Sequence, residues 1–324
     1  MKTSTTAASL FNILLMALAA PAMAQQAYPT KPVRLIVPFP PGGAIAIVAR
    51  LMGQKLTESW EQQVIVDHRP GANGIIAAEA TAKAPADGYT LMIVSSAHVI
   101  NPLLLPTSYD ALKDFAAVAT NASSELLLVV HPSVPANNVR ELIALAKARP
   151  AQLNYASSGS GNINHLSAEM FNMIAGVRTQ HIPYKGIGPA LTELMGGQVQ
   201  LLFTPPIAVI PQIKSGKLKP IAISGDTRLS ALPQVPTFAE GGLRNFELRY
   251  WFGILAPART PNAIIAKLSG EITKILAMAD IKENLFAQGM DTFASTPEQF
   301  AALMKADTAK FAKVVSTAGI KLNE

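Results

Sequence analysis

The sequence predicts an α/β fold with two lobes, in which each lobe contains a mainly parallel sheet flanked by helices. Short apolar runs rich in β-branched residues alternate with amphipathic segments along almost the whole chain, and this alternation is typical of βαβ units. The length of 324 residues suits about two domains of roughly 100–200 residues each. A third observation is a weak internal similarity between two stretches of the sequence. Residues 127–132 and 253–257 both resemble an apolar strand that ends in proline and leads through a short proline turn into a helix.

This internal similarity indicates where the chain passes between the lobes. If the chain crosses at both stretches, the first lobe is discontinuous and contains residues 25–125 and 250–324, and the second contains residues 126–249. Two crossings form a hinge, which allows the lobes to close over a ligand. The alternative is two tandem domains joined by one linker near Pro132.

The individual elements follow in order from local patterns. Residues 33–39 form a strand-like run that Pro40-Pro41-Gly42-Gly43 ends, and residues 44–56 carry apolar side chains at spacings of three and four, which predicts a helix with one buried face. Clusters of turn-forming residues then separate the later elements. The further expected strands are 63–67, 90–95, 126–130, 152–156 and 179–183, and the further helices are 75–83, 138–148 and 164–175.

The first 24 residues are typical of a secretory signal peptide. Lys2 precedes an apolar run at residues 10–20, and Ala22-Met23-Ala24 provides a small-residue cleavage motif. We expect cleavage before Gln25 and export of the mature protein to the periplasm. The alternative is an anchor helix, but the run is shorter than the ~20 residues that a membrane span needs, and Pro21 interrupts it.

Composition excludes several classes of protein. Hydrophobic residues make up 49% and charged residues 15% of the chain, which is incompatible with a disordered tail. The absence of cysteine excludes disulfide scaffolds, thiol nucleophiles and cysteine-ligated zinc. The 27 Lys and Arg residues do not cluster, and the five histidines contain no HxxxH pair. We therefore expect no nucleic-acid partner, no metal and no cofactor. After the first 24 residues no segment is long and apolar enough to cross a bilayer, so we expect no direct membrane insertion, and we expect a monomer.

Four segments are candidates for ligand binding because they follow predicted strands. Residues 38–43 join a strand to a helix through two glycines, and residues 154–162 combine hydroxyls, glycines and a helix start. Glycine allows close approach of the backbone, and a helix N-terminus offers free N–H groups to an anion. The alternatives without a binding role are a tight turn for residues 38–43 and a flexible serine–glycine loop for residues 154–162. Residues 95–98 and 184–186 are the other two candidates.

Sequence motifs for catalysis are weak. The Gly-x-Ser-x-Gly motif is absent, and a triad could be drawn only from Ser157, His165 and a distant aspartate. Such a combination can be found in any protein that contains serine, histidine and aspartate, so it is weak evidence for a catalytic triad. An exported α/β hydrolase is thus the minor alternative, and we expect a protein that is not an enzyme.

Several motifs, taken in chain order, resemble one family. They include Leu35-Ile36-Val37-Pro38-Phe39-Pro40-Pro41-Gly42-Gly43, then Asp67-His68-Arg69-Pro70-Gly71-Ala72-Asn73-Gly74, Leu153-Asn154-Tyr155-Ala156-Ser157-Ser158-Gly159, His181-Ile182-Pro183-Tyr184-Lys185-Gly186 and Trp251-Phe252-Gly253. These motifs resemble the receptors of tripartite tricarboxylate transporters, also called Bug solute-binding proteins. The resemblance covers nearly the whole mature chain.

The resemblance implies a two-lobed periplasmic binding protein of type II, a "Venus flytrap". It implies a small carboxylate ligand held between the lobes by uncharged donors and ordered water, and either delivery to membrane permease subunits or presentation to a sensor of a two-component system. The residues that we expect to bind the ligand are Phe39, Pro41, Gly42, Gly43, Ala44, Ser95, Ser96, Ala97, Ser157, Ser158, Gly159, Asn162, His165, Tyr184 and Thr204.

Two departures from the family pattern indicate the ligand's character. The family commonly has Ser-Thr-Asp where this chain has Ala44-Ile45-Ala46, and an aspartate near Phe203 where this chain has Thr204-Pro205-Pro206. Each change removes a carboxylate from the expected cleft and leaves more apolar surface. We therefore expect a carboxylate with an apolar or aromatic body, such as a phthalate isomer or a pyridine carboxylate, rather than an amino acid or citrate.

Overall fold

The computed structural model describes residues 28–244, 246, 248–318 and 320. The chain divides into two units, residues 1–30 and residues 31–324. The expected signal peptide, residues 1–24, lies outside the described residues. The first unit contributes only residues 28–30 to the description, and everything below concerns the second unit.

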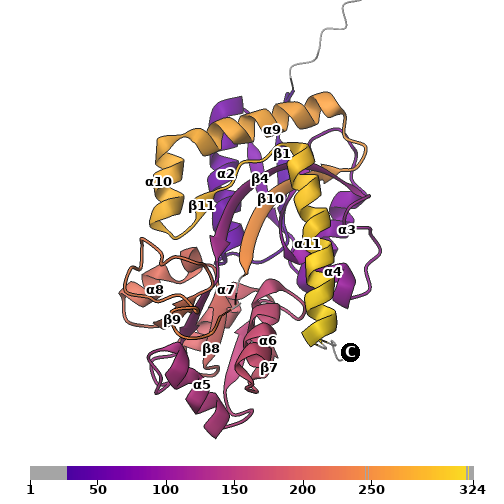
Figure 1. Cartoon of the computed structure of the whole chain (residues 1–324). Coiled ribbons are helices and arrows are strands. Elements are labelled where there is room, and N and C mark those ends of the chain that lie inside the picture. Colours follow the sequence, from indigo (N-terminus) through magenta and orange to yellow (C-terminus); the bar gives the residue numbers. More distant parts are fainter. Residues whose placement is uncertain (1–27, 245, 247, 319, 321–324) are drawn as a thin grey trace, which may run out of the picture. The chain divides into compact units, whose positions relative to one another are not determined.

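The first sheet of this unit joins strands from both ends of the sequence (Figure 1). Its order in the described residues is β11-β4-β10-β3-β1-β2. Strand β1 pairs in parallel with β2 and β3, whereas β10 runs antiparallel to β3 and β4, and β11 runs antiparallel to β4. The bounds are β1 Val33–Val37, β2 Val64–His68, β3 Thr90–Ser95, β4 Phe115–Glu125, β10 Arg249–Pro257 and β11 Asp291–Thr292.

The second sheet uses strands from the middle of the sequence, in the order β7-β6-β8-β5-β9. Strand β6 pairs in parallel with β7 and β8, and β5 runs antiparallel to β8 and β9. The bounds are β5 Leu127–Val130, β6 Asn154–Ser157, β7 Gln180–Pro183, β8 Leu201–Thr204 and β9 Lys219–Ile223.

Both sheets are mixed, whereas the sequence predicts mainly parallel sheets. The antiparallel pairs come from β4, β5 and β10, which lie on either side of the two points where the chain changes sheet. A strand that enters from the other sheet needs no crossover helix, so its direction is not restricted by the βαβ connection that enforces parallel pairing.

Helices flank both sheets, as expected for an α/β fold (Figure 1). In the first sheet's layers, α2 contacts β2 and α9, while α3 contacts β3 and β10. In the second, α6 and α7 each contact β6 and β8. The α-helices are α2 Ala44–Trp60, α3 Ile75–Ala82, α4 Ala97–Leu104, α5 Val139–Ala148, α6 Ile163–Ala175, α7 Ile187–Met195, α8 Ile210–Lys214, α9 Asn262–Ala277, α10 Ala279–Ala287 and α11 Pro297–Ala318, and the 3₁₀ turns are η1 Ala72–Gly74 and η2 Pro206–Ala208.

The chain passes between the sheets at two adjacent points. Only Leu126 separates β4 from β5, and Leu248 directly precedes β10. The Ser224 hydroxyl links the two passages, because it accepts a hydrogen bond from the Leu126 N–H at 2.8 Å and donates to the Leu248 carbonyl at 2.7 Å. The sequence predicts that the strands at residues 127–132 and 253–257 pass between the lobes. In the structure the chain passes between the sheets just before β5 and just before β10. The division into two lobes with the bounds given above stays a prediction.

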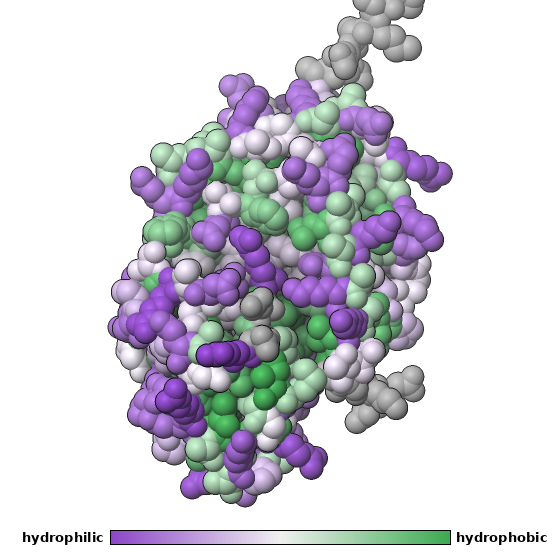
Figure 2. Space-filling model, viewed as in Figure 1, coloured by the Kyte–Doolittle hydropathy of each residue, from purple (hydrophilic) through white to green (hydrophobic). Residues whose placement is uncertain are grey.

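The long helix α11 packs against elements of both sheets, in addition to the two points where the chain passes between them. It contacts β4 and α4 beside the first sheet and α6 beside the second (Figure 1). Figure 2 shows hydrophilic residues in both the upper and lower halves of this face, and a group of hydrophobic residues in the lower half, over the second sheet. Within the described residues, no helix combines the length and the apolar character that a membrane span requires.

Candidate functional site

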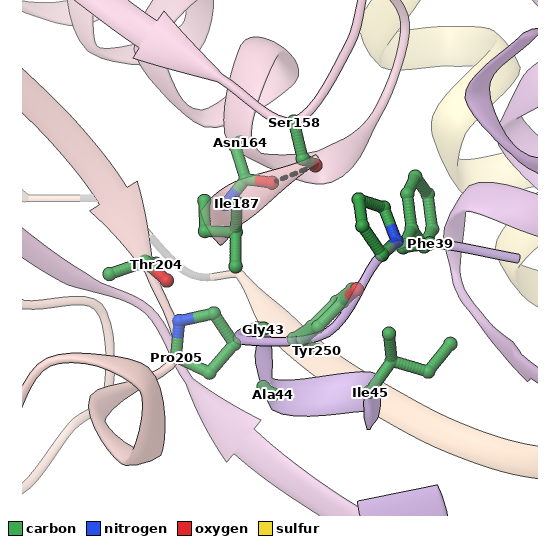
Figure 3. A pocket seen from close by; sticks show the side chains of 11 residues that line it. Phe39, Gly43, Ala44, Ile45, Ser158, Asn164, Ile187, Thr204, Pro205 and Tyr250 are labelled. Carbon is green, nitrogen blue, oxygen red and sulfur yellow. Dashed lines mark hydrogen bonds between the residues drawn. The ribbon is translucent and has the colours of Figure 1, made fainter. Parts of the chain in front are cut away.

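A cavity lies where loops from the two sheets meet (Figure 3). The empty space among its lining atoms amounts to about 360 Å³, part of which is open to solvent, and the room for the centres of water-sized groups is about 20 Å³. The surrounding loops must therefore move apart to admit a solute. The polar lining residues are Ser158, Asn164, Thr204 and Tyr250; the apolar ones are Phe39, Pro40, Ile45, Ile187 and Pro205; Gly43 and Ala44 complete the wall.

Three helices begin at this cavity. Helix α2 starts directly after Gly43, α6 after Asn162 and α7 after Gly186. The Asn162 side chain caps α6 by accepting hydrogen bonds from two backbone N–H groups, but no side chain caps α2 or α7. The first N–H groups of a helix have no partner within the helix, and the helix dipole makes this end positive. The cavity can thus attract an anion without a charged side chain.

Glycines allow the loops of the two sheets to touch beside the cavity. A Cβ atom built on Gly43 would lie 2.5 Å from Ile187 Cγ2, and one built on Gly188 would lie 2.9 Å from the Pro41 carbonyl oxygen. A Cβ on Gly186 would similarly lie 2.8 Å from Pro40. Real Cβ atoms do not approach other atoms this closely, so side chains at these positions would separate the two loops.

The loop between β6 and α6 is fixed by its own side chains. Ser157 Oγ donates to the Gly159 carbonyl at 3.0 Å and accepts from the Gly159 N–H at 3.2 Å. Ser158 Oγ donates to Asn164 Oδ1 at 2.9 Å and accepts a hydrogen bond from the Asn162 amide (Figure 3). Gly159 has a φ of 139° and a Cβ there would lie 3.1 Å from Asn73 Oδ1, so the position favours glycine on two grounds. The loop therefore presents the Ser158 side chain to the cavity in one defined arrangement.

Two stacked histidines form hydrogen-bond contacts with this loop. The rings of His165 and His181 lie 4.1 Å apart with an interplanar angle of 8°. Nδ1 of His165 accepts a hydrogen bond from the Gly161 N–H at 3.0 Å, and Nε2 of His181 lies 2.6 Å from Ser157 Oγ. Burial lowers the pKa of His165 to about 4 and, with the neighbouring His165, that of His181 to about 3. Both rings are therefore neutral near pH 7.

Acidification should destabilise the protein through these buried histidines. The pKa of His165 lies near 4 in the folded state, against about 6.5 in an unfolded chain, so the unfolded chain binds more protons between these values. The stability contribution of neutral His165 is complete above about pH 6.5 and is lost as the pH falls toward 4. The loss is at most about 1.4 kcal/mol per pH unit. Urea unfolding at pH 7, 6, 5 and 4 measures it.

The variant His165→Asn is the control for this prediction. Its amide oxygen can accept from the Gly161 N–H, but the side chain does not titrate. We expect a shallower pH dependence than in the wild type. Comparing the two also cancels the opposite contributions of Glu125 and Asp307, whose pKa values burial raises. Identical pH slopes for both proteins would contradict the assignment.

Neutral hydrogen-bonding groups dominate the chemistry of the cavity. Among the described residues, Tyr250 is the one lining residue with an ionisable side chain, and burial raises its pKa to about 12, so it stays protonated. Thr204 is fully buried, and its hydroxyl has no hydrogen-bond partner. A buried polar group without a partner is costly, so the Thr204 hydroxyl is available to form a hydrogen bond with a molecule that enters the cavity.

Comparison with known proteins places the chain in a family. Residues 48–320 match the family described as "Tripartite tricarboxylate transporter family receptor". The chain belongs to this family. The receptor is 37% identical over 308 residues to Protein BugT of Bordetella pertussis, covering 94% of each chain.

Solved structures agree with this membership. The receptor resembles a protein from R. palustris solved with adipate, with a TM-score of 0.89 and 35% identity over 91% of this chain and 99% of the other. It also resembles MatC from Rhodopseudomonas palustris with bound malate, with a TM-score of 0.83 and 30% identity over 89% of this chain and all of the other. These relatives confirm the two-lobed periplasmic binding-protein fold, and the receptor is a solute-binding protein rather than an enzyme.

The structure distributes the expected ligand-binding residues of the receptor over several places. Phe39, Gly43, Ala44, Ser158 and Thr204 line the cavity, and Ser95 and Ala97 line a second cavity that shares Phe39. The others lie around these cavities without lining them: Pro41 and Gly42 contact the Gly188 region, Ser96 precedes α4, Ser157, Gly159, Asn162 and His165 shape the loop before α6 or its first turn, and Tyr184 packs on the core of the second sheet. Their assignment as ligand contacts stays a prediction.

Other lining residues of the receptor were not predicted. Asn164 has a local signal, since it stands two residues after the helix cap Asn162. Ile187 directly follows the candidate segment 184–186, whereas Tyr250 comes from a segment that only the fold brings to the cavity. The tyrosine directly precedes the motif Trp251-Phe252-Gly253, but nothing in that motif indicates which side chain faces a ligand.

The hydrolase alternative does not match the geometry of the receptor. Ser157 lies beside His181, whereas His165 accepts from the Gly161 N–H. Ser157 is fully buried and lies outside the lining of the cavity. Within the part of the chain that the structure describes, no group of three or more histidine and acidic residues could hold a metal ion.

Proposed function

We propose that the receptor binds a small carboxylate with an apolar or aromatic body in the cavity between the sheets and delivers it to the membrane permease subunits of a tripartite transporter. The observation that carries the proposal is the combination of three helix N-termini with a lining free of acidic side chains among the described residues. Helix N-termini bind anions, and an acidic lining would repel them. The expected periplasmic location and monomeric state belong to the same proposal.

The apolar part of the lining supports a ligand with an apolar body. Phe39, Ile45, Ile187 and Pro205 lie opposite or beside the polar group formed by Ser158 and Asn164 (Figure 3). Ligand sites commonly combine mostly apolar walls with a few polar groups that fix orientation. The bound adipate and malate of the related structures support a carboxylate but differ in their apolar surface. The lining of this receptor favours the more apolar kind.

A thermal-shift screen tests the ligand class. The panel contains benzoate, the phthalate isomers and pyridine carboxylates on one side, and citrate and glutamate on the other. A ligand present at 100 times its Kd should stabilise the folded state by about 2.7 kcal/mol. Stabilisation by citrate or glutamate, with no effect of any aromatic acid, would overturn the proposed ligand class.

Removing the Ser158 hydroxyl should weaken binding of the best carboxylate from this screen. To bind a carboxylate, the Ser158 hydroxyl must turn its one hydrogen from Asn164 Oδ1 to the ligand. The new hydrogen bond to a charged group contributes about 1.5–3 kcal/mol and replaces a neutral one of about 0.5–1.5 kcal/mol, so Ser158→Ala should raise Kd by roughly 10-fold. Isothermal titration calorimetry measures the change. Ser215→Ala is the matched control, because Ser215 is exposed at the end of α8 and its hydroxyl donates to the Gln212 carbonyl, away from the cavity lining. Equal affinity of wild type and Ser158→Ala would remove Ser158 from the site.

A further inference from the structure

A second, smaller cavity lies on the other side of Phe39. Phe39 lines both cavities, with Pro38 on the side of the second and Pro40 on the side of the first. The second is formed by the end of β3, the start of α4 and the η1 turn, and it has room for about one water-sized group. Ser95 on its wall lies next to Tyr250 of the first cavity. A small substituent of a ligand in the first cavity could thus occupy the second.

Three polar groups on the wall of this second cavity have no hydrogen-bond partner, namely Ser95 Oγ, Nδ1 of His98 and the hydroxyl of Tyr109. His98 is 4% exposed and Tyr109 is 6% exposed, yet Nδ1 of His98 and the hydroxyl of Tyr109 make no hydrogen bond of acceptable geometry. The two rings stack with an interplanar angle of 8°. Buried polar atoms are nearly always paired, so an occupant that pairs with these atoms is expected.

The protonation of His98 defines what the occupant must supply. Nε2 of His98 lies 3.0 Å from the Ala111 carbonyl oxygen, and a carbonyl only accepts, so Nε2 carries the hydrogen. In the neutral ring Nδ1 is then an acceptor, and burial lowers the pKa of His98 to about 4. The Tyr109 hydroxyl, whose pKa burial raises to about 12, stays protonated and can donate. The occupant must therefore donate one hydrogen bond and can accept another.

A hydroxyl group has this pattern and this size. A cation is disfavoured because no acidic side chain lines the second cavity within the described residues. A second carboxylate is disfavoured because it offers no hydrogen to His98 Nδ1. An aromatic ring is too large for the space. Asn73 and Asn101, two further polar wall residues, already bond to each other, and the Asn101 side chain also lies beside the Tyr109 hydroxyl.

We propose that this second cavity is a subsite for a hydroxyl group of the solute, which donates its hydrogen bond to His98 and accepts one from Tyr109. The inference rests on the proposed function, since it assumes that a carboxylate occupies the first cavity. It narrows the solute to a hydroxylated carboxylate. His98 and Tyr109 are then the residues that distinguish such a solute from its analogue without a hydroxyl.

Matched pairs of ligands test this subsite. Titration calorimetry compares benzoate with 3-hydroxybenzoate and 4-hydroxybenzoate, and succinate with malate, on wild type and on Tyr109→Phe. We expect wild type to bind a hydroxylated acid about 10-fold more tightly than its parent. Tyr109→Phe should lose most of this preference and bind the parent acid within about twofold of wild type. The control Tyr89→Phe removes a hydroxyl next to the opposite end of β3 and should keep the preference.

Stability distinguishes a binding role from a structural one. Because the Tyr109 hydroxyl lacks a partner in the folded protein, Tyr109→Phe should leave the Tm of the free protein unchanged or raise it. A lower Tm, with equal loss of affinity for both members of a pair, would overturn the subsite.

The remaining outcomes separate this inference from the proposed function. Binding of parent and hydroxylated acids with equal affinity would leave the proposed function intact and show that the second cavity holds only water. Binding of neither series would overturn the proposed function and the subsite together.

Discussion

Replacement of Gly43 by valine should raise the Kd of the receptor for its carboxylate by more than about 100-fold. A Cβ atom at this position would lie 2.5 Å from Ile187 Cγ2, and the two methyl groups of valine would extend the clash. Ile187 is the first residue of α7 and Gly43 directly precedes α2. The substitution therefore separates two of the three helix N-termini that surround the cavity. A 100-fold loss corresponds to about 2.8 kcal/mol, and misplacement of two donors accounts for it.

The effect should be steric rather than conformational. Gly43 has φ −97° and ψ 166°, which any residue adopts, so valine causes no backbone strain there. Gly43→Ala should weaken binding less than valine, and the addition of Ile187→Ala should recover part of the affinity because it removes the clashing methyl group. Gly270→Ala is the matched control, since no atom lies within 4 Å of a Cβ built at Gly270. Wild-type affinity of Gly43→Val, measured by calorimetry, would contradict the contact between these loops.

The parts of the site that the sequence predicts are those with a local signal. Phe39 and Gly43 lie in a proline–glycine turn, and Ser158 lies in a serine–glycine loop, each between a strand and a helix. Such loops at the carboxyl ends of parallel strands are the common location of binding residues in α/β proteins. Tyr250 has no such signal, and Ile187 directly follows the candidate segment 184–186 without being a polar or turn-forming residue itself. They reach the cavity because β10 and α7 pack there, which depends on long-range pairing.

The strand directions likewise follow the sequence-based prediction only where a local pattern determines them. The segments that became β1, β2 and β3 alternate with helices, and the structure shows them parallel as expected. Strands β4 and β10 are joined to the second sheet by a chain without a covering helix, and their antiparallel pairing, with irregular register near Gly253, is absent from any local pattern. The candidate segment 95–98 does line the second cavity. Tyr109 on the opposite wall has no local signal, because it stacks on His98 only in the folded chain.

The position of Thr204 links the sequence departure to the ligand class. The family resemblance indicates an aspartate near this position, and the structure places Thr204 in the wall of the cavity, fully buried, with an unpartnered hydroxyl. A threonine hydroxyl can donate to a carboxylate, whereas an ionised aspartate can only repel it. We therefore expect a threonine at this position to favour an anion at the polar end of the cavity, and an aspartate to disfavour it.

Thr204→Asp should consequently reduce carboxylate binding by at least about 100-fold at pH 8. Two like charges about 4 Å apart repel by about 4 kcal/mol at an effective dielectric constant near 20. Burial raises the pKa of a carboxyl group, so the introduced group is partly protonated at pH 5. The loss of affinity should therefore be smaller at pH 5 than at pH 8.

The variant Thr204→Val is the control, because it keeps the shape of the side chain and removes only the hydroxyl. Its loss of roughly 10-fold should not change between the two pH values. Calorimetry with the same carboxylate at pH 5 and pH 8 separates the two effects, and unfolding curves confirm that both variants fold. If Thr204→Asp binds the carboxylate as tightly as Thr204→Val at pH 8, the ligand's charged end lies elsewhere in the cavity, and Ser158 with the start of α2 becomes the remaining candidate for holding it.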